Sequence, residues 1–298
     1  MLRRCLAGLF VIGQLSLSIS LSIAQAPRAT PAAAPTKLTD ADFAKHVEVL
    51  KKDKIPDKSF TVVIERPFVV IGDESADKVK QRAKNTVRWT VDLIKKQYFE
   101  KEPDHIIDVW LFADKESYEK YTKSIFDDKP TTPYGYYSPK HKALIMNIGT
   151  GGGTLVHEIV HPFVAANFPD CPAWFNEGLA SLYEQAGEKD GKIVGYPNWR
   201  LPGLQRAINA KAVSPFQKMC ATTTGEFYGD EKGTNYSQAR YLCYYLQEQG
   251  LLGKYYHEFV KNRKDDPTGY KTLQTVLGEK DMDDFQKRWE AIVMKLER

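Results

Sequence analysis

Two histidines that stand four residues apart constrain the fold of this 298-residue chain more than any other feature. They belong to the run His157-Glu158-Ile159-Val160-His161, and residues four apart on an α-helix project from one face, about one turn apart. Two imidazoles in this position can hold one metal ion, while the acid after the first histidine can reach a water molecule beside the ion. Composition alone produces such a run in roughly one chain in a hundred of this size, so the neighbouring residues must decide.

Glu177 is the candidate for a third metal ligand. A zinc site that catalyses hydrolysis has three protein ligands and an open fourth position for water. Glu177 follows His161 at a distance that leaves room for the first helix to end, for a turn at residues 169–172, and for a returning helix. The alternative interpretation is a solvated acid on a helix surface. We expect His157, His161 and Glu177 to bind the metal and Glu158 to act as general base.

These two segments carry a resemblance to a known group of enzymes. The histidine run, followed by Trp174-Phe175-Asn176-Glu177-Gly178-Leu179-Ala180, resembles the gluzincin zinc metallopeptidases, and in particular the bacterial peptidase-MA-like domains. The resemblance extends from Phe60 to the C-terminus and is weaker outside the two helices. It implies an α+β, zincin-like fold, with an N-terminal mixed α/β lobe that has an edge strand, a mostly helical C-terminal lobe, and an active-site cleft between them. It also implies one Zn²⁺ per chain and a peptide or protein substrate.

The resemblance also suggests a catalytic tyrosine. The segment from Tyr236 to Leu246 is similar to the helix on which aminopeptidase-type gluzincins keep a tyrosine that stabilises the transition state. Tyr236 is therefore the candidate and Tyr228 the reserve, while the alternative is an ordinary core or rim tyrosine. The Gly-x-Met-Glu-Asn run with which those aminopeptidases hold a free amine is absent, so endopeptidase action is favoured.

Three further residues near the motif lead to specific expectations. Pro162 directly follows the second histidine and removes the amide that would bond to the carbonyl of Glu158, so the helix is expected to kink there. Glu184 lies two helical turns beyond Glu177 and could accept a proton from a ligand histidine, although a surface acid is the commoner case. Asn176 could act in the same outer layer.

The N-terminus has the order of an export signal. Arg3 and Arg4 precede a long apolar run and a small-residue Ala-Gln-Ala segment, which predicts a signal peptide over residues 1–24 and export to a secreted or periplasmic location. An uncleaved N-terminal membrane anchor is the alternative. Residues 25–36 are a Pro/Ala-rich linker, and the catalytic domain is expected over residues 37–298.

Within the domain, hydrophobic periodicity predicts an α+β part over residues 37–170 and a helical part over residues 171–298. The glycine-rich segment 149–154 lacks the Gly-Lys-Ser/Thr of a phosphate loop and is interpreted as a strand-to-helix connection with Thr154 as N-cap. Ala143 to Ile148 is the candidate edge strand for docking an extended peptide. The predicted elements are strands within 60–73, 106–112, 134–138 and 143–148, and helices at 76–98, 115–126, 154–168, 173–186, 204–210, 237–248, 252–263 and 282–296.

Charge and cysteine content narrow the function classes. The formal net charge of +4 falls to +2 once Arg3 and Arg4 are removed, which is too small an excess of positive charge to indicate a nucleic-acid-binding protein.

Beyond the signal, Cys243 lies in an apolar helical stretch and is expected to be buried, which leaves a bridge between Cys171 and Cys220 as a hypothesis. The histidines outside the motif are interpreted as surface or loop residues: His46, His105, His141 and His257.

Two rival functions stay open at this point. The same ligands could belong to a non-catalytic, zinc-stabilised binding or scaffold protein, which a fourth protein ligand such as His105 or His141 would mark. They could also belong to a zinc hydrolase that cleaves a non-peptide amide. The sequence leaves substrate specificity and oligomeric state undetermined.

Overall fold

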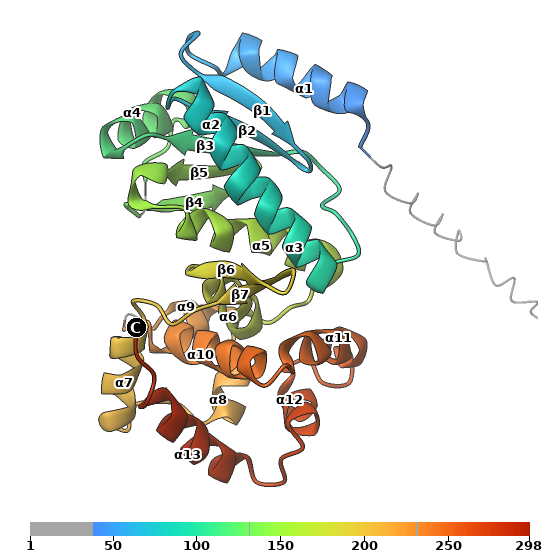
Figure 1. Cartoon of the computed structure of the whole chain (residues 1–298), viewed down its shortest axis with the longest axis vertical. Coiled ribbons are helices and arrows are strands. Elements are labelled where there is room, and N and C mark those ends of the chain that lie inside the picture. The colour runs from blue at the N-terminus through green and yellow to red at the C-terminus, as the bar shows by residue number, and fades with distance from the viewer. Residues whose placement is uncertain (1–37, 131, 231) are drawn as a thin grey trace, which may run out of the picture. The chain divides into compact units, whose positions relative to one another are not determined.

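The computed structural model describes residues 38–130, 132–230 and 232–298 (Figure 1). It is a mixed α/β structure, as the coarse prediction states. The predicted signal over residues 1–24 and the linker over residues 25–36 lie outside the described residues. The N-terminal elements are α1 (Asp40–Asp53), β1 (Thr61–Glu65), β2 (Phe68–Gly72), α2 (Ala76–Arg82), a π-helical turn (Ala83–Arg88), α3 (Trp89–Gln97), β3 (Ile107–Phe112), α4 (Lys115–Phe126), β4 (Gly135–Ser138) and β5 (Ala143–Asn147).

The five strands form one mixed sheet in the order β1-β2-β3-β5-β4. β2, β3 and β5 are parallel, whereas β1 and β4 pair antiparallel with their neighbours. β5 lies between β3 and β4, since Met146 pairs with Leu111 on one side and with Gly135 on the other. The expectation that Ala143 to Ile148 is an edge strand is therefore wrong. β4 occupies that edge, because the hairpin folds its first strand outward.

Both faces of the sheet are covered. β2, β3 and β5 are buried along their whole length, as expected for strands with helices on both sides. On one face Val70, Val109 and Leu144 join the core that includes α3 and α5, while on the other Ile71 and Trp110 pack with α1 and α4. The helix α1 was not predicted. Its apolar residues are few among many charges, and it is stabilised by its contact with the sheet.

The C-terminal part is mostly helical but contains one β-hairpin that was not predicted. The expected helix over 173–186 ends at Leu182, and the hairpin follows it. In Figure 1 this hairpin lies between the sheet and the helices below it. The elements are α5 (Gly153–Asn167), α6 (Ala173–Leu182), β6 (Ala186–Lys189), β7 (Lys192–Gly195), α7 (Leu201–Asn209), α8 (Phe216–Cys220), α9 (Thr224–Tyr228), α10 (Thr234–Glu248), α11 (Leu252–Asn262), α12 (Tyr270–Leu277) and α13 (Met282–Val293).

The helix α5 continues through Pro162 to Asn167. The proline removes one backbone hydrogen bond, but its neighbours Ile159, Val160 and Phe163 are buried and hold the helix in the core. The predicted N-cap is wrong, because α5 begins after Gly152 and no side chain caps it. The first residue of α5 must be a glycine, since a Cβ on Gly153 would lie 2.2 Å from the carbonyl oxygen of Glu184.

The helix α6 packs most closely against α10. A Cβ on Gly178 would lie 3.0 Å from the carbonyl oxygen of Ala239 and 3.1 Å from Cys243 Sγ. The glycine therefore allows α6 to approach α10. The helix that carries Glu177 is therefore held in place by its packing against α10.

The cysteines Cys171, Cys220 and Cys243 are all free thiols, so the hypothesis of a bridge between Cys171 and Cys220 is wrong. Cys243 is buried, as predicted. Within the described ranges, none of the helices combines the length and the apolar character that crossing a membrane requires.

Candidate metal centre

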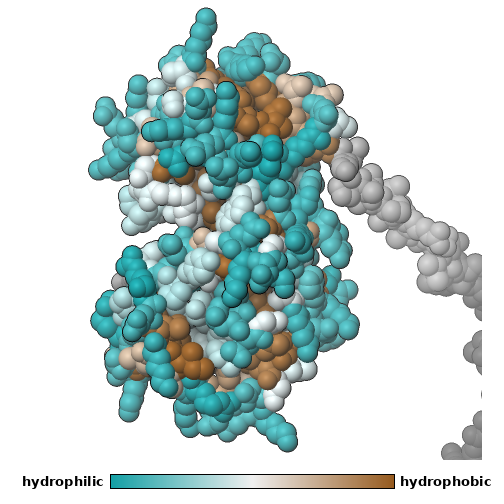
Figure 2. Space-filling view, in the orientation of Figure 1, coloured by the Kyte–Doolittle hydropathy of each residue, from teal (hydrophilic) through white to brown (hydrophobic). Residues whose placement is uncertain are grey.

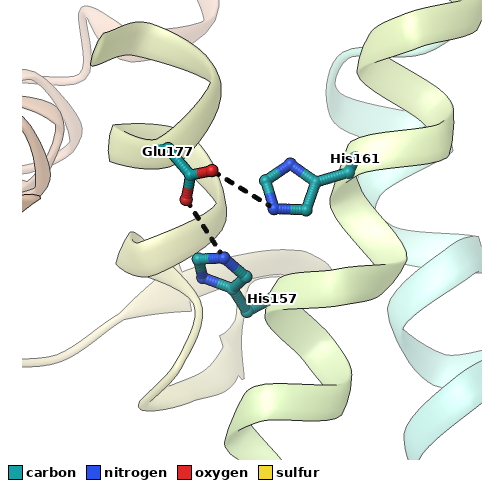
Figure 3. A group of neighbouring side chains, drawn as sticks. All are labelled: His157, His161 and Glu177. Atoms are coloured by element: carbon teal, nitrogen blue, oxygen red, sulfur yellow. Dashed lines mark ion pairs between the residues drawn. The ribbon is translucent and has the colours of Figure 1, made fainter. Parts of the chain in front are cut away.

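Three predicted ligands converge between α5 and α6 (Figure 3). His157 and His161 project from one side of α5, and Glu177 projects toward them from α6. His157 Nε2 lies 3.2 Å from Glu177 Oε2, and His161 Nε2 lies 3.9 Å from Glu177 Oε1. One ligand atom from each residue lies within 4.8 Å of the others. The helical spacing thus brings both imidazoles to one carboxylate, as predicted.

The residues of this cluster fit a metal ion. His157 and Glu177 are buried, yet Glu177 Oε2 has no hydrogen-bond partner in the described part of the chain. A buried carboxylate oxygen without a partner is costly, and a cation between it and two imidazole nitrogens removes that cost. Two histidines and one glutamate are also the donor set of known catalytic zinc sites. The cluster can therefore hold a metal ion.

His161 is oriented by Asn176. Its Nδ1 lies 3.0 Å from Asn176 Oδ1, and because this amide oxygen only accepts, Nδ1 carries the hydrogen. The lone pair is then on Nε2, which is the nitrogen that faces Glu177. Asn176 therefore has the outer-layer position that was offered for it, where it supports His161 from the residue just before Glu177.

His157 is held from its other side by Glu184. Glu184 Oε1 lies 3.5 Å from His157 Nδ1, which is an ion-pair contact and not a hydrogen bond, while Nε2 faces Glu177. Glu184 is not on the same helix as Glu177, because α6 ends at Leu182. The argument from helical spacing was therefore wrong in its geometry, although the acid still reaches the histidine. Its contact with His157 excludes the surface-acid interpretation.

Two residues that the sequence reasoning missed hold Glu184 in place. Arg200 Nε donates to Glu184 Oε2 at 2.9 Å and Nη2 donates to Oε1 at 2.7 Å, which is a bidentate pair. Asn198 Nδ2 donates to Oε2 at 2.9 Å. Both residues follow the hairpin β6–β7. Since that hairpin was unforeseen, no signal in the sequence could have placed them beside the site.

The charges of this cluster compensate one another. Burial alone would lower the pKa of His157, but the carboxylates of Glu177 and Glu184 raise it to about 10. Burial would raise the pKa of Glu177, but the two histidines and Tyr228 lower it to about 2. Glu184 behaves alike, because Arg200 and His157 outweigh burial and lower its pKa to about 2. Both carboxylates stay ionised and His157 holds a proton against them, so a metal ion that binds His157 would displace that proton.

The tyrosine named in reserve is the one that contacts a ligand. Tyr228 Oη donates to Glu177 Oε1 at 2.6 Å. Tyr236 lies one ring further away, with its centroid 6.1 Å from that of Tyr228. Burial and the carboxylates of Glu177 and Glu158 raise the pKa of both phenols, so both tyrosines stay protonated and face the same negative charges. Glu158 is half-buried on α5 beside His157.

We expect Arg200→Met to weaken metal binding, because it removes the charge and the fork that fix Glu184 against His157. Loss of such outer partners typically costs about 10- to 100-fold in metal affinity, and we expect the zinc dissociation constant to rise by that factor. Arg200→Lys keeps the charge without the fork and should fall between the two. The constant is measured by competition with a chromophoric chelator.

The control for this change is Arg288→Met. Arg288 forms surface ion pairs with Glu279 and Asp284 on the distant helix α13, and its loss should leave zinc affinity unaltered. Equal zinc affinity in Arg200→Met and wild type would contradict the role of Arg200.

No other group of His, Cys, Asp or Glu side chains in residues 38–130, 132–230 and 232–298 could hold a metal ion. The histidines outside the motif, including His105 and His141, do not join the cluster. No protein-family model and no curated protein matches the sequence. The interpretation of the site therefore depends on its own side chains.

Proposed function

We propose that the protein is a zinc-dependent metallopeptidase of the gluzincin type that cleaves within peptide chains. The observation that carries this proposal is the convergence of His157, His161 and Glu177 with Glu158 next to the first ligand. Three ligands without a fourth His, Cys, Asp or Glu in the described cluster support an open position for water.

In this proposal His157, His161 and Glu177 hold one Zn²⁺, which supplies the Lewis acidity that activates water and polarises a carbonyl group. Glu158 takes a proton from the attacking water and later delivers it to the leaving amine. Asn176 and Glu184 keep the imidazoles in the orientation that the metal requires.

A tyrosine hydroxyl can stabilise the oxyanion that forms at the carbonyl carbon. Tyr236 is the residue that the resemblance suggests, and the contact with Glu177 favours Tyr228 for the same task. Both phenols stay protonated and can donate a hydrogen bond. We infer that one of these two neighbouring rings supplies that donor.

The fold supports substrate binding between a sheet part and a helical part, as in a zincin-like enzyme with two lobes and a cleft. Figure 2 shows a hollow in this face, between the level of β4 above and that of β6 and α9 below. The edge strand β4 contacts α5, and in the described residues no strand pairs with its outer side. An extended peptide can pair with it beyond Gly135, whose amide and carbonyl bond to the Thr132 hydroxyl. The substrate would reach the enzyme outside the cell or in the periplasm.

The rival proposals are a zinc-stabilised scaffold and a zinc hydrolase of a non-peptide amide. A scaffold site needs no general base and no open position, whereas Glu158 stands beside the ligands and the described cluster has three members. These observations favour an enzyme. Cleavage of an unfolded protein would distinguish a peptidase from a hydrolase of another amide.

Metal removal tests the proposal. Purified mature protein should contain about one zinc ion per chain and cleave an unfolded protein such as reduced casein. Dialysis against 1,10-phenanthroline should abolish cleavage, and stoichiometric zinc should restore it, whereas calcium should not. Zinc without cleavage of any peptide would move the function to one of the two rivals, and failure of metal-replete protein to retain zinc would refute the proposal.

A further inference from the structure

A continuous row of side chains leads from solvent to Glu177, the candidate metal ligand on α6. It consists of three aromatic rings and one guanidinium group, and we call it the aromatic row: Trp199, Arg200, Tyr236 and Tyr228. The guanidinium carbon of Arg200 lies 4.2 Å from the ring centroid of Trp199 and 5.1 Å from that of Tyr236. Tyr236 contacts Tyr228, whose hydroxyl bonds to Glu177. Each member thus touches the next, and the row ends at the carboxylate that holds the metal.

The two end members of the row, Trp199 and Tyr228, are exposed to solvent. Trp199 is 58% exposed, the highest value among the exposed large hydrophobic residues in the described ranges, and Tyr228 is 47% exposed. Single exposed rings are common on proteins and need no explanation. Two such rings that are joined to a metal site are a different case, because tryptophan and tyrosine are the residues that contribute most to binding surfaces.

The guanidinium in the row is held in place by its own ion pair. Arg200 is locked by its bidentate pair with Glu184, and both side chains are largely buried, at 14% and 12% exposure. Trp199 therefore stacks one face on a fixed guanidinium and leaves its other face to solvent. A ring that is already ordered loses little conformational entropy when a ligand covers it.

The row offers apolar surface and little net charge. The charge of Arg200 is compensated by Glu184 at hydrogen-bond distance, so it is not free to attract an anionic ligand. The carboxylates of Glu158 and Glu177 lie near the inner end of the row and disfavour acidic groups there. The ligand that fits this surface is therefore a large apolar group.

We propose that the aromatic row binds a large aromatic or aliphatic side chain of the peptide substrate. This inference rests on the proposed function. The contacts that join Trp199 to Glu177 place this surface beside the cluster of ligands. The row selects substrates by apolar contact, while Glu158 and the metal ligands act on the bond.

The test uses one set of four peptides that differ at one position, with phenylalanine, leucine, alanine or aspartate there. Wild type should cleave the phenylalanine and leucine peptides with kcat/KM about tenfold or more above the alanine peptide, the size of effect that a large apolar side chain gains from apolar contact. Trp199→Ala should lose most of this ratio, and Trp199→Phe should keep much of it. Zinc content is measured in each variant so that a damaged metal site is recognised.

Binding is measured separately in Glu158→Gln protein by fluorescence anisotropy of labelled peptides, so that it does not depend on turnover. Tighter binding of the phenylalanine peptide that Trp199→Ala abolishes would support the inference, even if no peptide were cleaved and the proposed function failed. The exposed Ile292 on α13, which has no part in the aromatic row, provides the control variant Ile292→Ala.

Equal binding of phenylalanine and alanine peptides would overturn the inference, as would equal selectivity in wild type and Trp199→Ala. An N-acetylglucosamine oligomer is included as a competitor, because exposed tryptophan also stacks on sugars. If the oligomer bound through Trp199 and the peptides did not, the surface would recognise a glycan and the inference would be wrong.

Discussion

Glu158→Gln protein is expected to retain its zinc and to lose turnover by about a thousandfold. A positioned general base contributes on the order of 10² to 10⁴ to such a reaction, and glutamine has nearly the shape of glutamate but cannot take a proton at neutral pH. Glu158 is not one of the three candidate ligands, which are His157, His161 and Glu177. The change therefore separates catalysis from metal binding. Single-turnover hydrolysis and zinc content are measured on the same sample.

A matched control removes the same charge elsewhere on a helix. Glu119→Gln alters an exposed residue of α4 and should leave both zinc and turnover at the wild-type level. If Glu158→Gln turned over substrate at the wild-type rate, Glu158 would not be the base. A loss of zinc together with turnover would instead place Glu158 among the residues that hold the metal.

Local patterns were sufficient to predict the two helices that form the candidate metal site. The run from His157 to His161 required a helix for its side chains to meet, and the segment around Glu177 required a second helix that returns. Both helices are present, and their residues converge as the spacing predicted. Each of these predictions depends on residues within a few turns of one another, where periodicity is informative.

The features that were missed depend on contacts between distant segments. The edge position of β4 is determined by the pairing of β5 with β3, which no local pattern encodes. The supports of Glu184 come from Asn198 and Arg200, which the hairpin β6–β7 carries to the site. The hairpin follows α6 in a segment where the apolar residues still have a helical spacing. This spacing predicted a helix to residue 186, whereas α6 ends at Leu182.

The outer layer of the site shows how spacing can suggest a contact for the wrong reason. Glu184 was offered as a partner of a ligand histidine because two helical turns separate it from Glu177, although a surface acid was the favoured interpretation, and the helix ends before Glu184. The chain turns back after α6, and Arg200 then fixes the carboxylate against the histidine. Sequence spacing suggested the partner, while the tertiary fold supplied the geometry.

Glu177→Gln is expected to abolish tight zinc binding. The amide oxygen is a weak ligand without charge, and the loss of a direct ligand should exceed the roughly 100-fold cost of losing an outer partner such as Arg200. Glu177 is also the acceptor for Tyr228 and the carboxylate that faces both histidines, so no neighbouring side chain takes its place.

Thermal unfolding gives a readout that does not depend on activity. Zinc at a hundred times its dissociation constant stabilises a folded protein by about 2.7 kcal/mol, which raises the melting temperature of wild type by several degrees. Glu177→Gln should show no such rise at the same zinc concentration, while Glu158→Gln should show the full rise. An equal rise in all three proteins would mean that zinc binds elsewhere, and the cluster of His157, His161 and Glu177 would not be the metal site.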